Sequence, residues 1–65
     1  MNKNFVRFTE VRVDENGEDY TNELMLDQSL IIAIRGTYYG TEIITTEDNY
    51  SVINSFDTVR AILDI

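Results

Sequence analysis

Hydrophobic and polar residues alternate along the first part of the chain, which is the pattern of half-buried β-strands. In residues 5–13, Val6 and Phe8 share one face of an extended chain, whereas the two valines that end the segment have the opposite parity. This change of parity predicts a β-bulge near Thr9 and Glu10, because one extra residue on a strand moves the following side chains to the other face.

Four more segments have the composition of strands and are bounded by polar or glycine-containing turns, at residues 20–26, 30–35, 41–46 and 50–53. Asn16-Gly17 in the first turn is typical of a hairpin, because both residues accept φ > 0. Residues 30–35 are apolar on both faces, which predicts a central strand that is covered on both sides. Ser55 as N-cap and an apolar stripe at helical spacing predict a helix over residues 55–64.

These elements predict a single α+β domain over residues 1–65, mostly β. Its sheet is expected to be a small antiparallel sheet or partial barrel of about five strands, with the short C-terminal helix packed on it. A chain of 65 residues has a thin stability margin, and small scaffolds are commonly stabilised by disulfides, a metal or a partner subunit. Because the sequence has no cysteine and no histidine, we expect self-association into a homo-oligomer.

The net charge is −7, from twelve acidic and five basic residues. This charge opposes direct binding to nucleic acid or to an anionic membrane, and it favours either a basic protein partner or simply the solubility of a small protein. The longest apolar run, Leu30 to Ile34, is far shorter than the ~20 residues that span a bilayer. The absence of cysteine fits a reducing compartment, so a cytoplasmic location is expected.

Catalytic machinery is not expected in this chain. Nucleophilic catalysis needs a base beside a Ser, Thr or Cys, and histidine, the residue that most often acts as this base, is absent. Without histidine and cysteine, the common ligands of transition metals are also missing. We therefore expect neither enzyme activity, nor a metal, nor a cofactor.

Two segments are candidate binding sites. The first is a turn in which a guanidinium, a hydroxyl and two aromatic rings lie close together in sequence, at Arg35, Thr37, Tyr38 and Tyr39. Arginine binds phosphate and tyrosine stacks on a base, so two such turns in an oligomer could hold a small nucleotide. The alternative is that the tyrosines pack in a subunit interface, where tyrosine is enriched.

The second candidate is an acidic patch for a partner protein, formed by Asp14, Glu15, Glu18, Asp19 and Glu23. The alternative is an ordinary solvated turn. The spacing of oxygen ligands does not match a calcium loop, because Gly17 is the fourth residue of a loop that begins with Asp14, whereas the calcium loop has its glycine at the sixth.

The second half of the chain resembles the small flagellar FlbD family and short phage and prophage proteins of the same layout. The matching stretches are 26–34, with its Ile-rich strand; 43–52, with Ile-x-Thr-Thr, an acidic turn and Tyr-x-Val; and 54–59, at the capped helix. The chain departs from the family at Asp27, where Asn is usual, and at Asn54, where Glu is common, and its acidic hairpin is longer. The resemblance implies a fold and a phage or prophage origin, and no catalytic residues.

Three functions fit these observations. The first is a small non-enzymatic interaction module that acts as a homo-oligomer and binds a host protein. The second is an acidic inhibitor that imitates nucleic acid and blocks a basic host protein. The third is a protein that sequesters a small nucleotide signal through the turn at residues 35–39.

Overall fold

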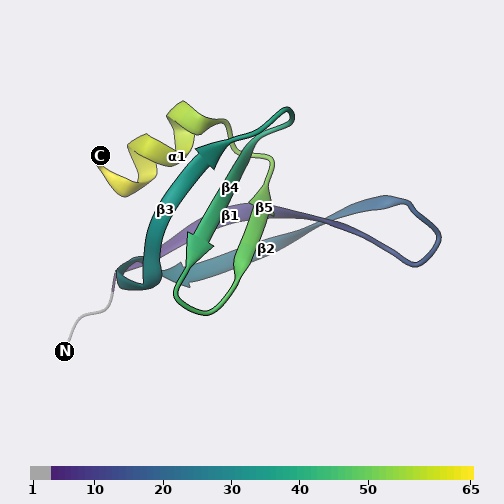
Figure 1. Ribbon diagram of the computed structural model, residues 1–65, viewed down its shortest axis with the longest axis horizontal. Helices are drawn as coiled ribbons and strands as arrows, with labels where there is room; N and C mark the ends of the chain where they lie inside the picture. Colours follow the sequence, from purple (N-terminus) through teal and green to yellow (C-terminus); the bar gives the residue numbers. More distant parts are fainter. Residues whose placement is uncertain (1–3) are drawn as a thin grey trace.

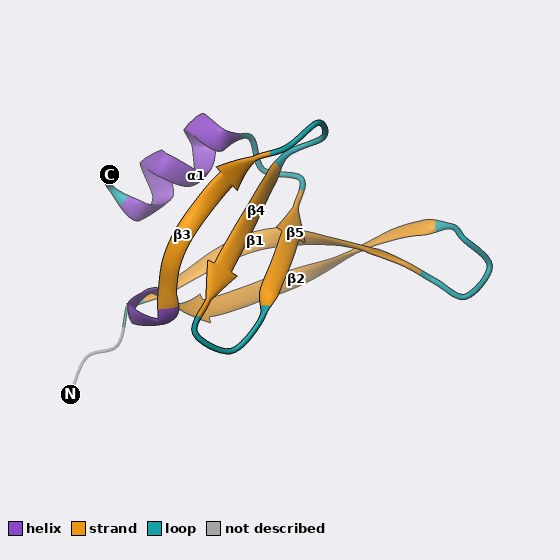
Figure 2. Ribbon diagram, viewed as in Figure 1, coloured by secondary structure: helices purple, strands orange, loops and turns teal. Residues whose placement is uncertain are grey.

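A computed structural model describes residues 4–65, and the first three residues of the predicted domain lie outside the described part. Within this range a five-stranded antiparallel sheet is followed by one α-helix, as Figures 1 and 2 show, so the predicted α+β fold class is confirmed. The strand order is β2-β1-β5-β4-β3. The elements are β1 (Phe5–Val13), β2 (Asp19–Asp27), the 3₁₀ turn η1 (Gln28–Leu30), β3 (Ile31–Gly36), β4 (Thr41–Thr45), β5 (Asn49–Val52) and α1 (Phe56–Leu63).

The β1–β2 hairpin is continuous, and the predicted bulge in β1 is wrong. Its register runs without interruption from Phe5 opposite Asp27 to Val13 opposite Asp19. The parity of the apolar residues changes because Glu10, and not an apolar residue, takes the next core-facing position after Phe8. The Glu10 carboxylate is buried and accepts a hydrogen bond from Arg12 Nη1 at 3.2 Å. A charged partner two residues along the strand thus allows a carboxylate at the rim of the core.

The turn of this hairpin is held by one carboxylate. Asp14 Oδ1 accepts from the amides of Asn16 and Glu18, at 2.8 and 2.9 Å. The Gly17 amide donates to the Asp14 carbonyl, and Gly17 alone in this turn has positive φ, at 83°. The predicted arrangement with φ > 0 at both Asn16 and Gly17 is therefore wrong, and the turn is the longer kind that ends in a left-handed glycine.

The core lies between one face of the sheet and α1. The fully or nearly fully buried apolar side chains are Phe8, Leu26, Ile43, Val52, Val59 and Leu63. The helix begins where predicted, because Ser55 Oγ accepts from the Thr58 amide at 3.1 Å. Its apolar stripe faces the sheet. These contacts stabilise the helix, which would be too short to persist alone in water.

The third strand is not central. The apolar segment at β3 lies at an outer edge of the sheet, next to β4 only, so the prediction of a strand covered on both sides is wrong. Ile31 and Ile34 pack against the core, whereas Ile32 and Ala33 are exposed on the other face. The register shifts between Ile31 and Ala33, so the one irregularity of strand pairing in the described sheet lies here.

Asn54 joins the two halves of the sheet. β1 and β5 pair at Glu10 and Val52, and beyond this pair the Ile53 amide donates to the Thr9 carbonyl at 2.9 Å. The Thr9 amide donates to Asn54 Oδ1 at 2.9 Å, and Thr41 Oγ1 donates to the Asn54 carbonyl at 2.8 Å. One residue thus links the hairpin, the β3–β4–β5 sheet and the start of the helix.

The role of Asn54 predicts a measurable loss of stability in Asn54→Ala. This change leaves the half-buried Thr9 amide without its acceptor, which costs about 1–3 kcal/mol of unfolding free energy. The matched control is Asn49→Ala, at an exposed position of β5, with an expected change within about 0.5 kcal/mol. Urea unfolding followed by circular dichroism measures both, and equal effects would contradict the assigned role.

Candidate interaction surfaces

The outer part of the β1–β2 hairpin projects from the rest of the molecule. β1 pairs with β5 only at Glu10. Within the described sheet, residues 11–21 therefore pair only among themselves, the outer part of β1 with the start of β2. We call this segment the arm. Figure 1 shows it extending well away from the helix and from β3. Apart from the half-buried Val11, every residue of the arm is exposed.

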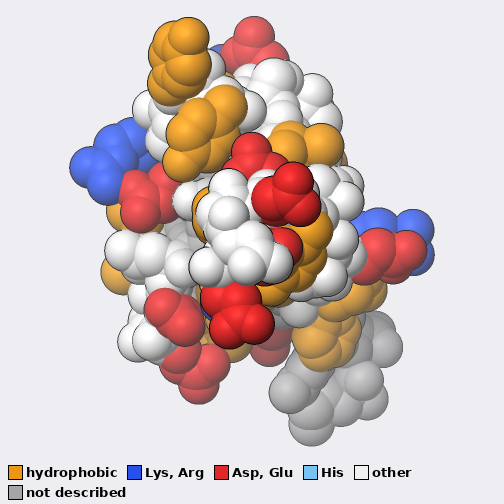
Figure 3. Space-filling view, turned by 90° about the vertical axis from the view of Figure 1, so that its right-hand side faces the viewer, with side chains coloured by type: hydrophobic (Ala, Val, Ile, Leu, Met, Phe, Trp, Pro, Cys, Tyr) orange, Lys and Arg blue, Asp and Glu red, His pale blue; other side chains and the backbone are white. Residues whose placement is uncertain are grey.

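The arm carries most of the predicted acidic patch. Asp14, Glu15, Glu18 and Asp19 are all exposed and lie in or beside its turn. Figure 3 looks onto the tip of the arm and shows acidic side chains gathered around it, with hydrophobic side chains behind. Glu23 lies further back on β2, where its carboxylate is 3.9 Å from Arg7 Nε.

A groove lies at the base of the arm, and sequence reasoning missed it. Its volume is about 470 Å³, and its lining combines the arm with the β3–β4 turn and the end of β5: Val11, Arg12, Val13, Asp19, Tyr39, Ser51 and Ile53. Three large apolar side chains remain open to solvent here, with exposed fractions of 61% for Val13, 61% for Tyr39 and 50% for Ile53. The sequence signal for this exposed apolar surface was the parity of Val13, which is opposite to that of Phe8 and places Val13 on the face away from the core.

The candidate residues of the turn at 35–39 are not brought into one pocket. Arg35 donates from Nε to Glu42 Oε1 at 3.0 Å and also contacts this oxygen through Nη2, so a carboxylate of its own chain holds the guanidinium. Tyr38 is fully exposed, whereas Tyr39 lines the groove at the base of the arm together with Arg12. Thr37 is exposed, and its amide donates to the Gly40 carbonyl across the turn.

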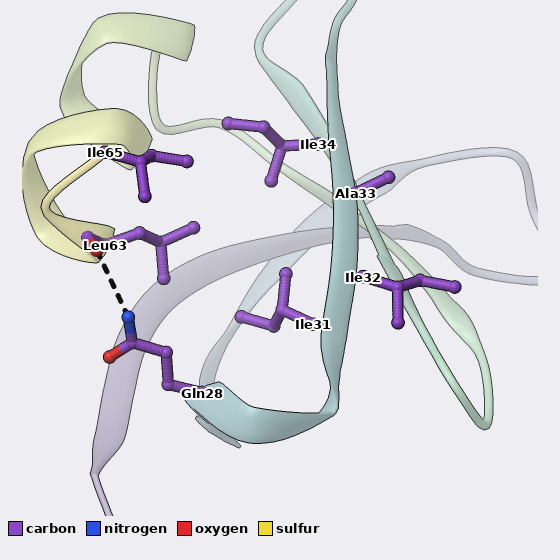
Figure 4. A pocket seen from close by; sticks show the side chains of 7 residues that line it. All are labelled: Gln28, Ile31, Ile32, Ala33, Ile34, Leu63 and Ile65. Atoms are coloured by element: carbon purple, nitrogen blue, oxygen red, sulfur yellow. Dashed lines mark hydrogen bonds between the residues drawn. The ribbon is translucent and has the colours of Figure 1, made fainter.

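A second, smaller groove of about 160 Å³ lies between β3 and the end of α1. In Figure 4, Ile31 and Ile34 point toward Leu63 and Ile65 across this groove. Gln28 closes one end, because its Nε2 donates to the Leu63 carbonyl at 3.1 Å. Sequence reasoning missed this groove too, because it placed β3 in the middle of the sheet.

In residues 4–65, no group of three acidic, histidine or cysteine side chains is placed to hold a metal ion. Over the same range, every buried side-chain nitrogen or oxygen has a hydrogen-bond partner. No helix in the described range has the length and apolar character that a bilayer span requires.

Comparison with known proteins adds no relative: no family model matches the chain, and neither a curated protein nor a solved structure matches it. The resemblance to the FlbD family and to phage proteins therefore stays a prediction.

The turn chemistry of the arm predicts different effects for two neighbouring carboxylates. Asp14→Ala removes the acceptor of the Asn16 and Glu18 amides, so these amides should exchange with solvent about fivefold faster, for a loss of about 1 kcal/mol. Glu15→Ala removes an exposed carboxylate of the same turn and should leave their exchange unchanged. NMR hydrogen exchange measures both, and an unaltered rate in Asp14→Ala would show that the carboxylate does not order the turn.

Proposed function

We propose that the protein is a non-enzymatic interaction module that self-associates and binds a basic host protein through the arm and the groove at its base. The groove carries this proposal, because Val13, Tyr39 and Ile53 form an apolar centre that the chain itself leaves open. Isolated exposed apolar residues are normal, but three of them around one concave surface are typical of a binding site.

The surroundings of the groove have the composition of an interface rim. The lining of the groove adds one acid, Asp19, one base, Arg12, and the hydroxyl of Ser51 to this apolar centre, and protein interfaces combine a desolvated core, often containing tyrosine, with a polar rim. The turn of the arm beyond the groove is acidic, with Asp14, Glu15 and Glu18 exposed, so the partner surface that complements the arm is basic. The projecting shape lets the arm enter a partner's cleft without moving the core.

Site-specific photo-crosslinking tests this surface. A photoreactive phenylalanine analogue in place of Tyr39 should give a covalent adduct with a second kind of protein in cells that naturally contain the chain. The same analogue in place of Glu47, exposed in the β4–β5 turn and outside the groove lining, is the control and should give none. Adducts are detected by mass on denaturing gels.

The contribution of the apolar centre is tested in the same experiment. Adding Val13→Asp should reduce the adduct at position 39 by about tenfold or more, because a charge placed in a desolvated contact costs at least about 1.4 kcal/mol. Met25→Asp, at a residue of similar exposure outside the groove, should leave the adduct unchanged. If position 39 gives no adduct, or if both substitutions act alike, the groove is not the binding surface.

Imitation of nucleic acid is the second candidate function, and the clustering of exposed acids around the tip of the arm favours it. Contacts between exposed charges weaken strongly with salt, because the screening length falls from about 10 Å at 0.1 M to about 3 Å at 1 M. In extracts of the same cells adjusted to these salt concentrations, the adduct yield at position 39 should fall steeply if the acids dominate binding. A yield that does not respond to salt would leave the apolar groove as the main contact and remove imitation of nucleic acid.

A phage or prophage origin and a cytoplasmic location belong to the same proposal. The first rests on the resemblance of residues 24–63 to short phage proteins, and the second on the absence of cysteine. Sequestration of a nucleotide has less support, because Arg35 is bonded to Glu42 and lies outside the groove that Tyr39 lines.

A further inference from the structure

The two outer edges of the sheet differ in how well they resist pairing with another strand. β2 carries acidic residues at Asp19, Glu23 and Asp27, and charged side chains are a usual protection of edge strands. β3 has no acid, lysine or proline, and the charge of its single arginine is matched by Glu42. The side chains of β3 therefore do not protect its edge from pairing with another strand.

The backbone of β3 offers hydrogen-bonding groups to a further strand. The Thr37 amide donates to the Gly40 carbonyl, and bonding to β4 alternates along an antiparallel pair, so Arg35 and Ala33 direct their amides and carbonyls toward β4. The amides and carbonyls of Ile34 and Gly36 then point away from it. Both Ala33 and Gly36 are exposed, so the edge between them is open to solvent.

The helix forms the second wall of this edge. Gly36 at one end of β3 lies against Phe56, close enough that an added Cβ would be 3.5 Å from Phe56 Cδ1. Gln28 at the other end bonds the Leu63 carbonyl. Between these ends lies the smaller groove, seen in Figure 4, with the side chains of Ile31 and Ile34 on its floor. A cavity of about 150 Å³ holds a group the size of benzene, so this groove has room for one aliphatic side chain.

The distribution of charge suits a second copy of the chain at this edge. Residues 28–41, which include all of β3, contain no acid, although the whole chain has a net charge of −7. The acidic arm projects from the opposite side of the molecule in Figure 1. The longest dimension is 41 Å, whereas charges in 0.15 M salt are screened over about 8 Å, so the arms of two copies joined at β3 do not repel each other strongly.

We propose that β3 of two copies pair in an antiparallel manner about a twofold axis at Ile34, which joins two sheets into one. In this register Ile34 faces Ile34 of the second copy, and Arg35 faces Ala33. A register centred on Arg35 would set two guanidinium groups opposite each other, which is destabilising. Residues that face each other share one side of a sheet, so Ile34 of the second copy lies on the side of the groove. This pairing rests on the self-association in the proposed function and is independent of the arm.

Cysteine substitution tests the register, because the chain has no cysteine of its own. Ile34→Cys should form a disulfide between copies under mild oxidation, because Cα atoms about 5.5 Å apart in such a pair suit a disulfide. Ile32→Cys is the matched control: it is more exposed, but the two copies of residue 32 lie about 13 Å apart in this register and should not react. Denaturing gels without reductant separate the 7.5 kDa chain from the linked species of twice that mass.

Sedimentation equilibrium at micromolar concentration gives the second measurement. The unmodified protein should be a dimer, and Ile32→Lys should raise its dissociation constant about tenfold or more, because a charge is placed on the pairing edge. Met25→Lys introduces the same charge at similar exposure on β2 and should leave the dimer intact. Urea unfolding of each variant separates loss of pairing from loss of folding.

The outcomes distinguish this pairing from the broader proposal. A dimer that survives Ile32→Lys, or one in which positions 32 and 34 crosslink equally fast, overturns the β3 pairing but leaves self-association standing. A monomer at all concentrations overturns both. Crosslinking of a host protein at position 39 decides the arm separately, whichever result the β3 variants give.

Discussion

The hydrogen bonds around Asn54 are the constraint on which the rest of the structure depends. The hairpin and the β3–β4–β5 sheet pair with each other only briefly, at Glu10 and Val52, and the bonds to Thr9 and Thr41 extend this junction. The same residue precedes the N-cap of α1, so the position of the helix over the core is set at the same point. A short junction suffices because the buried side chains on both sides of it belong to one cluster.

This junction also determines which surfaces are available. β1 pairs with β5 only at Glu10, so its outer part has β2 as its one neighbour and becomes the arm, with the groove at its base. Gly40 is needed here, because a Cβ at this position would lie 2.1 Å from the Val52 carbonyl oxygen. The close approach of these two backbones brings the β3–β4 turn, and with it Tyr39, beside the arm. The surface proposed for a host protein and the edge proposed for a second copy therefore lie on different sides of the molecule and do not compete.

Much of the fold could be predicted from the sequence, because the apolar positions of each strand follow which of its side chains are buried. Alternation gave the bounds of β1, and the cap at Ser55 gave the start of α1 within one residue. The order of the strands in the sheet was harder to predict. A segment that is apolar on both faces has the same pattern whether it is central or lies at an edge with an uncovered face, as β3 does. The buried carboxylate of Glu10 interrupts the apolar pattern of β1 in the same way as a bulge would, because its pairing with Arg12 depends on side-chain geometry that the sequence does not contain.

The candidate site was predictable only in part. The acidic turn is visible as a run of charges, and its exposure follows from its composition. The groove beside it joins Val13, Tyr39 and Ile53, which are distant in sequence and come together only because of the strand order. The same limit applies to the turn at residues 35–39, where sequence proximity did not produce a shared pocket.

The arm is a two-stranded ribbon whose length is independent of the core. Since side chains on a strand repeat every two residues, adding or removing two residues on each of its strands would keep every side chain on its present face and leave the register at Glu10 untouched. Its reach can therefore vary in steps of about 7 Å while the remaining fold stays the same. One scaffold could in this way serve partners with clefts of different depth, with the tip chemistry and the reach changing separately.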